Sequence, residues 1–470
     1  MIKYDAFISY VSDDNNDGYL DDFIKQLRDS DDINVWYDKN EIKIADRWKI
    51  EIKKAIQNSL LFIPVITKHY IRKEWTQFEL IIAKYNSKDI LPLIKEEAFT
   101  NTNITNISKM ILRIIKNLHY SNFNKEESIK LIKDKINSLK EKTDYKFFEN
   151  DISFVDKVKH LYNKNGYHVQ NYNEDKQFSC IKSDFIMIRS ENKVKQEEIV
   201  VKCYDNPLLD NDIEALEELI ECVNKSKIHN LRMYISKEFY VNFLKIKLDD
   251  KFSKHSIDIY DYFQILDECF QFNNYKKELE KRKDDYFFKK KDDDNLKNYK
   301  LSSLDNQIIL DWYKKNESPC LIISYDKTDS IDIFNYHLTK NFFNHPHKYP
   351  LPVFIKCANY HKYKDLENII FDELRIKERM KNNFYDLSKN KYQMVYIFDC
   401  LNLSHDNNYF KELITQMLIY KKAQKIIIIC QKEYIEIIEK FNPISLNSKE
   451  KDIFDSIPNN YEFKYEYVIL

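Results

Sequence analysis

The sequence predicts an α/β protein in which a flavodoxin-like N-terminal domain, built on a parallel sheet, is followed by two further α/β domains. Apolar runs of strand length alternate with amphipathic segments of helix length in the first and last thirds of the chain. These runs are continuously apolar, which is typical of parallel strands covered by helices on both faces. The length of 470 residues also suits about three domains of ~150 residues each.

The first domain is predicted to span residues 1–145. Its strands are expected at 4–10, 33–37, 60–66 and 90–94, and its helices at 18–29, 46–58, 73–85 and 124–141. In a doubly wound sheet of this kind, a ligand lies beyond the carboxyl ends of the strands. Residues that follow a strand are therefore the first candidates for a site.

A second domain is predicted at 150–272, a charged linker at 273–300 and a third domain at 301–470. The linker contains the run KKKDDD, whose apolar content is too low for a core. Strands of the second domain are expected at 184–190, 197–205, 231–236 and 257–261, with helices over FVDKVKHLYNKN near its start and over 211–226. Strands of the third domain are expected at 320–324, 352–357, 393–398 and 425–430, with helices between them.

Composition excludes several classes of protein. The formal net charge is −1, so neither a basic surface for nucleic acid nor an acidic tail is indicated. Only two glycines are present, and neither G-x-G-x-x-G nor G-x-x-x-x-G-K-[ST] occurs in the chain. No apolar run approaches the ~18 residues of a membrane helix, and the N-terminus lacks the features of a signal peptide.

All eight cysteines follow residue 150, and no two of them form a C-x-x-C pair. A disulfide framework or a zinc site is therefore not expected, and no metal-binding residue is assigned. Reduced, buried thiols together with the lack of a signal peptide indicate a cytoplasmic protein. We expect neither a membrane nor a nucleic acid as partner.

The most informative local pattern is WTQFE at 75–79, which follows a buried strand and opens an amphipathic helix. Trp75 and Glu79 are four residues apart, so they share one face of a helix, one turn apart. An aromatic ring beside a single carboxylate at the edge of a parallel sheet can hold and cleave a nucleotide-like ligand. The alternative is that Trp75 belongs to the core and Glu79 is a solvated surface residue.

Further segments accompany this pattern in order, namely YDAFISYVSDD (4–14), VWYDKNEIKIADRW (35–48), KKAIQNS (53–59), LFIPVIT (61–67), YIRKEWTQFEL (70–80) and ILPLI (90–94). With them the N-terminal third, about 30% of the chain, resembles a TIR domain. The resemblance implies either a scaffold or an enzyme that hydrolyses NAD⁺ at the glycosidic bond to nicotinamide, in some members with cyclisation of the product. It implies Glu79 as the catalytic residue and Trp75 as its aromatic neighbour.

A single carboxylate suffices for this chemistry. The nicotinamide of NAD⁺ is already a cationic leaving group, so no general acid is needed to protonate it, whereas ordinary glycosidases need a pair of carboxylates. One negative charge near the ribose can stabilise the oxocarbenium-like transition state and can accept hydrogen bonds from ribose hydroxyls. NAD⁺ is then the substrate, and no cofactor is required.

The resemblance also implies substrate contacts by other residues. Phe99 lies in a loop that supplies a nicotinamide-packing Trp in NAD⁺-cleaving TIR domains, and its alternative role is to cap the core. Trp48 ends a loop that in the family closes over the site and mediates self-association. Ser9, Tyr10 and Asp13 lie at the end of the first strand, at the mouth of the expected site.

Two departures from the family pattern concern this mouth. Ala45 and Asp46 replace the usual glycine of the loop, although glycine tolerates a positive φ at little cost. Val11 stands where some members carry an arginine. Arg47 and Arg72 are candidate substitutes for the phosphate contact of that arginine, with surface charges as the alternative.

Residues 151–270 resemble a restriction-endonuclease fold of Mrr type, through the opening helix, a Gly-Tyr turn and the strands with DFI and VVKCYD. An active nuclease of that class needs an Asp and then an acid-x-Lys triple to hold Mg²⁺. Asp184 and Lys202 fit the first and last members, but Val200 stands in the middle position and Glu198 is offset by two residues. We therefore expect a degenerate, non-catalytic domain.

The third domain resembles the P-loop core of NACHT-type NTPases. The segment CLIISYDKTDSI contains the expected Lys327-Thr328 pair, but Asp326 replaces the glycine before it. An Asp there would repel phosphates and crowd the turn. Asp399 in MVYIFDCLN matches the acid of a Walker B strand, whereas Asn402 replaces the acid that follows. The resemblance therefore implies a degenerate domain, and no ATP site is assigned.

The leading hypothesis is an NAD⁺-cleaving TIR effector fused to a regulatory region, with signal transduction in prokaryotic antiviral defence as the setting that the family implies. Self-association through the TIR domain into a homo-oligomer would activate it. The C-terminal domains would sense a trigger of unknown identity, such as a ligand or a phage component. The alternatives are a non-enzymatic TIR scaffold and a Mg²⁺-dependent nuclease that uses Asp184, Glu198 and Lys202.

Overall fold

The computed structural model describes residues 3–15, 18–31, 33–37, 48–95, 105–118, 120–141, 152–164, 167–171, 183–191, 195–208, 210–225, 230–252, 257–291, 320–325, 329–357, 366–376, 394–400, 426–431 and 465–469. The chain forms two compact units. The first comprises Met1–Thr143, Phe178–Lys182 and Tyr204–Ile259, and the second comprises Asp144–Gln177, Ser183–Cys203 and Tyr260–Leu470.

The first unit begins with a domain of alternating strands and helices. In chain order these are β1 (Tyr4–Ser9), the 3-10 helix η1 (Ser12–Asp14), α1 (Tyr19–Asp31), β2 (Val35–Trp36), α2 (Trp48–Gln57), β3 (Ser59–Ile66), α3 (Glu74–Tyr85), β4 (Asp89–Ile90), β5 (Leu93–Ile94), α4 (Asn106–Lys116), β6 (Ser121–Asn122) and α5 (Lys125–Glu141). The sheet has the order β2-β1-β3-β5-β6, with β4 also paired to β3. All of these pairs are parallel, which confirms the predicted flavodoxin-like sheet. The sequence patterns predicted neither α4 nor β6.

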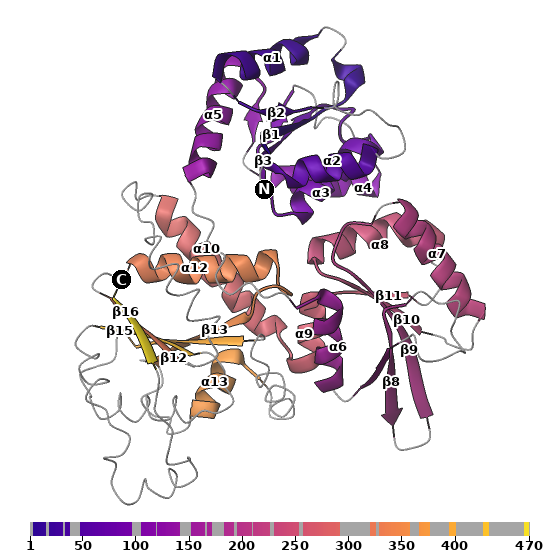
Figure 1. The fold of residues 1–470 in the computed structure, drawn as a ribbon, viewed down its shortest axis with the longest axis vertical. Coiled ribbons are helices and arrows are strands. Elements are labelled where there is room, and N and C mark those ends of the chain that lie inside the picture. Colours follow the sequence, from indigo (N-terminus) through magenta and orange to yellow (C-terminus); the bar gives the residue numbers. More distant parts are fainter. Residues whose placement is uncertain are drawn as a thin grey trace, which may run out of the picture. The chain divides into compact units, whose positions relative to one another are not determined.

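Side chains of β1 alternate between the two faces of this sheet. Ala6 and Ile8 belong to a core shared with α1 and α5, which cover one face (Figure 1). Phe7 points to the opposite face, where its ring stacks on Phe62 with 5.5 Å between the ring centroids. Helices α2 and α3 lie against β1 on this second face. Ser9 shares the face of Phe7 because the two are two residues apart, so Ser9 is directed toward these helices.

Helix α3 is held at its C-terminal end by a later segment of the same unit, which contains α7 (Asp210–Lys225), β10 (Asn230–Ile235) and α8 (Glu238–Phe252) and leads into β11 (Ile257–Asp261). The hydroxyl of Tyr85 lies 2.6 Å from Ser236 Oγ, and its ring meets the ring of Tyr240 edge-on at 5.3 Å. Burial on the sheet and this anchor together fix the position of α3.

The second unit contains α6 (Phe154–Lys164), β7 (His168–Asn171), β8 (Phe185–Glu191), β9 (Lys195–Tyr204), α9 (Tyr262–Phe270), α10 (Asn273–Lys291), β12 (Cys320–Tyr325), α12 (Asp329–Asn344), β13 (Leu351–Lys356), α13 (Leu366–Leu374), β14 (Met394–Asp399), β15 (Ile426–Gln431) and β16 (Tyr465–Ile469). Strands β7, β8 and β9 pair antiparallel. The last five strands form a parallel sheet with the order β13-β14-β15-β12-β16. The predicted α/β character of the C-terminal third is thus confirmed. Within the described residues, every helix is too short or too polar to cross a lipid bilayer.

Candidate active site

The strand order of the N-terminal sheet creates a topological switch point between β1 and β3. The chain leaves β1 toward β2 on one side and then crosses to β3 on the other side of β1. In open α/β sheets, ligands bind beyond the carboxyl ends of the strands at such a point. These ends are Ser9 of β1 and Ile66 of β3, and residues 67–73 lead from β3 into α3. Residues that follow these two strands therefore define the candidate site.

Glu79 points from α3 toward the sheet. Only 2% of this residue is exposed, and its Oε2 accepts a hydrogen bond from the hydroxyl of Ser9, which is 1% exposed. The burial excludes the alternative in which Glu79 is a solvated surface residue. A buried carboxylate is costly unless polar groups bond to it, so a fold that retains one at a ligand-binding edge marks a candidate functional site.

A second hydroxyl extends this contact. Tyr70 is fully buried in the turn after β3, and its Oη lies 2.8 Å from Ser9 Oγ. Burial raises the pKa of the Tyr70 phenol well above its ordinary value, and the charge of Glu79 raises it further, while the hydrogen bond to Ser9 acts in the opposite direction. Tyr70 therefore stays protonated and can donate. Sequence reasoning missed it because no local spacing links it to Ser9, 61 residues away.

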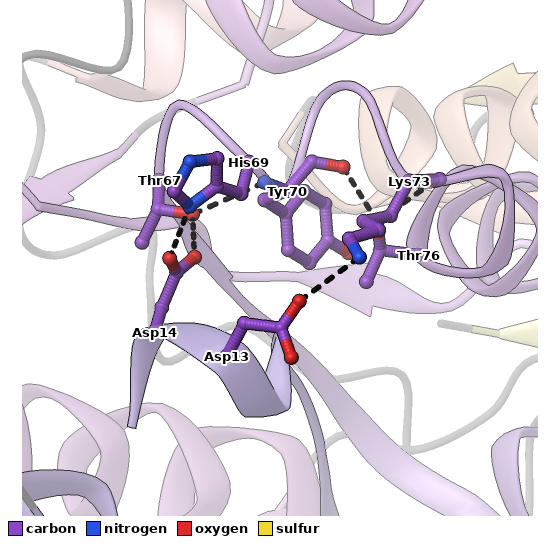
Figure 2. Close-up of polar contacts among 7 residues, drawn as sticks. All are labelled: Asp13, Asp14, Thr67, His69, Tyr70, Lys73 and Thr76. Atoms are coloured by element: carbon purple, nitrogen blue, oxygen red, sulfur yellow. Dashed lines mark hydrogen bonds and ion pairs between the residues drawn. The ribbon is translucent and has the colours of Figure 1, made fainter. Parts of the chain in front are cut away.

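The turn that carries Tyr70 is tied to η1, as Figure 2 shows. Asp14 accepts a hydrogen bond from the hydroxyl of Thr67 and lies 2.5 Å from Nδ1 of His69. Thr67 Oγ1 in turn accepts a hydrogen bond of 3.1 Å from the backbone N–H of Tyr70. On the other side, the hydroxyl of Thr76 in α3 donates to the Tyr70 carbonyl at 2.5 Å. These contacts join the loop after β1, the turn after β3 and the start of α3.

The other predicted substrate contacts have different surroundings. Asp13 lies on η1 with 66% of its side chain exposed and forms an ion pair of 2.9 Å with Lys73 (Figure 2). Trp75 is half-buried, and its ring lies 5.8 Å from the ring of Phe78 between centroids. Tyr10 is partly buried and packs against the core under α1 and α5.

A family model described as the TIR domain matches residues 6–133. This range contains the parallel sheet up to β6, the switch point and helix α3. Residues 6–133 are a TIR domain. The resemblance of the N-terminal third is thus confirmed.

The TIR domain is also similar to parts of curated proteins. The probable 2′ cyclic ADP-D-ribose synthase TcpO of Methanobrevibacter olleyae is 26% identical over 143 residues, which are 29% of this chain and 40% of that protein. The 2′ cyclic ADP-D-ribose synthase BtTIR of Bacteroides thetaiotaomicron is 36% identical over 78 residues, 17% of this chain and 26% of that protein. The NAD(+) hydrolase TcpA of Theionarchaea archaeon (strain DG-70-1) is 31% identical over 98 residues, 19% of this chain and 28% of that protein.

The chain therefore spans less than half the length of these curated relatives. Among solved structures, the TIR domains of the activated Roq1 resistosome, which directly recognizes the pathogen effector XopQ, are 19% identical to this chain. They cover 28% of this chain and 99% of that chain, with a TM-score of 0.23.

Some residues that the TIR resemblance singled out are outside the described part of the chain, namely Phe99 and residues 45–47. Trp48 is the first residue of α2, and its side chain is also outside the described part. Val11 is buried, whereas Arg72 is exposed. The roles expected for these residues therefore stay predictions.

Two of the predicted nuclease residues of the second unit, Asp184 and Lys202, bond to each other. Lys202 Nζ lies 3.1 Å from Asp184 Oδ1, and the backbone N–H of Cys203 donates to Asp184 Oδ2 at 2.6 Å. Glu198 stands opposite Ile188 in the register of β8 and β9. Among the residues that the structure describes, no three His, Cys, Asp or Glu side chains gather into a metal site. Asp184 is thus held by Lys202 and by the backbone of β9.

In the last sheet, Asp399 ends β14 and is half-buried. Residues 326–328 and Asn402, which complete the P-loop resemblance, are outside the described part. Cys400 follows Asp399, and its Sγ lies 3.1 Å from Sγ of Cys357, both as free thiols. This sheet therefore presents a strand-end carboxylate beside a pair of buried thiols.

Proposed function

We propose that the TIR domain cleaves NAD⁺ at the bond between nicotinamide and ribose, with Glu79 as the catalytic residue. The observation that carries the proposal is the buried carboxylate on α3, bonded to Ser9 at the switch point between β1 and β3. The names of the relatives, two cyclic ADP-ribose synthases and an NAD⁺ hydrolase, support the same class of chemistry.

The reaction requires a stabilised positive charge rather than a proton donor. The bond between C1′ and the pyridinium nitrogen breaks, its electron pair moves to the ring, and nicotinamide leaves as a neutral base. The ribose then carries an oxocarbenium-like charge, which a nearby carboxylate stabilises most strongly where water is excluded. Water, or a hydroxyl of the same molecule, attacks C1′ and loses its proton, which gives linear or cyclic ADP-ribose.

Neighbouring residues take supporting roles in this proposal. Ser9 donates to the carboxylate of Glu79 and so limits its orientation. Trp75, half-buried one turn before Glu79, provides an aromatic surface for a ring of the dinucleotide. The remaining proposed substrate contacts are Tyr10, Asp13, Trp48 and Phe99.

We further propose that a homo-oligomer formed through the TIR domain is the active state, in antiviral signalling in the cytoplasm. A trigger such as a phage component would act on the segments that follow the TIR domain. One contact supports such control, because Tyr85 at the end of α3 is bonded to Ser236 in front of α8. A displacement there has a direct route to Glu79 on the same helix. Specific activity that rises with protein concentration would support the oligomer, and activity independent of concentration would contradict it.

The test of catalysis compares nicotinamide release from NAD⁺ by the concentrated full chain and two variants. Glu79→Gln keeps the shape of the side chain and removes its charge, so we expect a loss of about 100-fold or more. Glu74→Gln is the matched control, because Glu74 begins the same helix with 85% of its side chain exposed. It should stay within about twofold of the wild type, as surface substitutions usually do.

Wild-type release by Glu79→Gln would contradict the catalytic assignment. The main alternative, the non-enzymatic scaffold, is supported if the concentrated wild-type chain releases no nicotinamide although sedimentation demonstrates that it has self-associated.

A further inference from the structure

The hydroxyls between Tyr70 and Glu79 form a chain of hydrogen bonds with a defined direction. A hydroxyl carries one hydrogen, and an ionised carboxylate can only accept. Ser9 gives its hydrogen to Oε2 of Glu79, so in its contact with Tyr70 it acts as the acceptor. The order is therefore Tyr70 O–H to Ser9 Oγ, and Ser9 O–H to Glu79.

The main chain of Tyr70 is held on both sides of its side chain. Its N–H donates to Thr67 Oγ1 at 3.1 Å, and its carbonyl accepts from Thr76 Oγ1 at 2.5 Å (Figure 2). Thr67 is itself bonded to Asp14 in the loop after β1. The phenol is thus directed at Ser9 by contacts from three separate segments of the TIR domain.

The Tyr70 hydroxyl also has a cost that a phenylalanine would not have. The residue is fully buried, and a buried hydroxyl costs free energy unless it is hydrogen-bonded. Phenylalanine would fill nearly the same volume without that requirement. Burial keeps the pKa of the phenol well above its ordinary value, so the proton needed for donation is present at neutral pH.

We propose that Tyr70 is a positioning residue for the reaction, acting through Ser9 to hold the Glu79 carboxylate in the orientation that the ribose requires. This inference rests on the proposed NAD⁺ cleavage. Without the phenol, Ser9 Oγ loses its donor and is free to enter other staggered rotamers, so the carboxylate loses its fixed neighbour. Orientation of a charged group matters more for the transition state than for the bound substrate, so kcat is affected more than KM.

The experiment measures kcat and KM for nicotinamide release by the full chain. Tyr70→Phe should lower kcat by about 10-fold and leave KM within about twofold. Ser9→Ala should lower kcat at least as much, and Ser9→Thr, which keeps a hydroxyl, should recover part of the loss. Tyr275→Phe is the matched control, because Tyr275 is also fully buried and its hydroxyl donates a hydrogen bond, to the carbonyl of Pro352 at 2.9 Å, but it lies in the second unit. It should keep the wild-type kcat.

A second readout needs no activity. Urea unfolding of the wild type, Tyr70→Phe, Glu79→Gln and the double variant forms a double-mutant cycle. Non-additive unfolding free energies support the connection between the two residues, and additive ones overturn it.

The two proposals fail in different ways. If Glu79→Gln is inactive while Tyr70→Phe has the wild-type kcat, the positioning role is overturned and the proposed function stands. If Glu79→Gln has the wild-type rate, the proposed function fails and the catalytic role of Tyr70 fails with it. The cycle then still reports whether Tyr70 and Glu79 are coupled in the fold.

Discussion

Glu79 and Asp184 are the central carboxylates of the two sites that the sequence predicted. In the described contacts, Glu79 is bonded to a neutral hydroxyl and Asp184 to a charged ammonium group. Glu79 is 2% exposed and accepts from the neutral hydroxyl of Ser9. The side chain of Asp184 is 21% exposed and pairs with the ammonium of Lys202 and the backbone N–H of Cys203. A lysine cancels the charge of its partner locally, whereas a hydroxyl only orients it. Of these described contacts, the one between Ser9 and Glu79 fixes the orientation of a carboxylate without adding an opposite charge.

The first prediction separates the two carboxylates by geometry instead of charge. Glu79→Asp keeps the negative charge but withdraws it from Ser9 by one methylene, so kcat for nicotinamide release should fall by about 100-fold. Asp184→Glu changes a side chain by the same methylene in the other unit and should leave kcat unchanged. Wild-type turnover by Glu79→Asp would remove the positional requirement on which the difference between the two sites depends.

The second prediction is that the loss of the Asp184 carboxylate destabilises the fold and does not change the rate of nicotinamide release. Asp184→Ala leaves both Lys202 and the N–H of Cys203 without this acceptor, at a cost of about 2 kcal/mol in urea unfolding. Nicotinamide release per folded molecule should be unchanged.

The same variant tests for a metal. We expect Mg²⁺ to leave the melting temperature of the wild type where it is. A Mg²⁺-dependent rise that disappears in Asp184→Ala would instead revive the nuclease hypothesis, because ligands that bind the native state raise its stability.

The parts of the site that could be predicted are those encoded by residues close together in the chain. Strand β3 was expected at 60–66 and occupies Ser59–Ile66, and helix α3 was expected at 73–85 and occupies Glu74–Tyr85. Continuous apolar runs and helical spacing are local patterns, so they survive whatever the rest of the chain does. The four-residue spacing of Trp75 and Glu79 likewise identified the helix that carries the carboxylate.

The remaining parts depend on distant residues or on segments with mixed signals. Tyr70 meets Ser9 across 61 residues of sequence, through a turn whose path no periodic pattern describes. Helix α4 was missed although NISKMILRIIK has isoleucines at helical spacing, because it follows a polar stretch rich in Asn and Thr that favours turns. In the structure one of those polar residues, Thr105, caps the helix by accepting from Ser108 N–H. Because the same residue types begin helices and form turns, the sequence alone did not decide whether this stretch precedes a helix or continues as a loop.

A third prediction extends the comparison to a buried positive charge. Lys157 is 1% exposed, its Nζ donates to the carbonyl of His347 at 2.8 Å, and burial lowers its pKa from 10.5 to about 7. Between pH 7 and 10.5 the unfolded chain binds a proton that the folded chain does not, so stability rises with pH in this window. Lys157→Met removes this dependence. Its stability relative to the wild type should therefore drop by about 1 kcal/mol from pH 8 to pH 9 in urea unfolding.

The contrary result would be that the unfolding free energy of Lys157→Met rises relative to the wild type from pH 8 to pH 9. That change has the wrong sign for a lysine whose pKa is lowered by burial. It would mean that the ammonium is stabilised in the fold, as a paired charge is, and not merely tolerated. The neutral carbonyl of His347 would then be an incomplete description of its surroundings.

The smallest expected effect belongs to the exposed ion pair of Asp13 and Lys73, whose side chains are 66% and 53% exposed. Water and salt compete for such pairs, so Lys73→Ala should change the unfolding free energy by less than about 0.5 kcal/mol. Asp14→Ala should cost more, because Asp14 is 14% exposed and bonds to Thr67. If Lys73→Ala proves the more damaging of the two, exposed charge outweighs buried hydrogen bonding in this turn. The rule that more buried polar contacts contribute more to stability would then fail within the TIR domain, which contains Glu79.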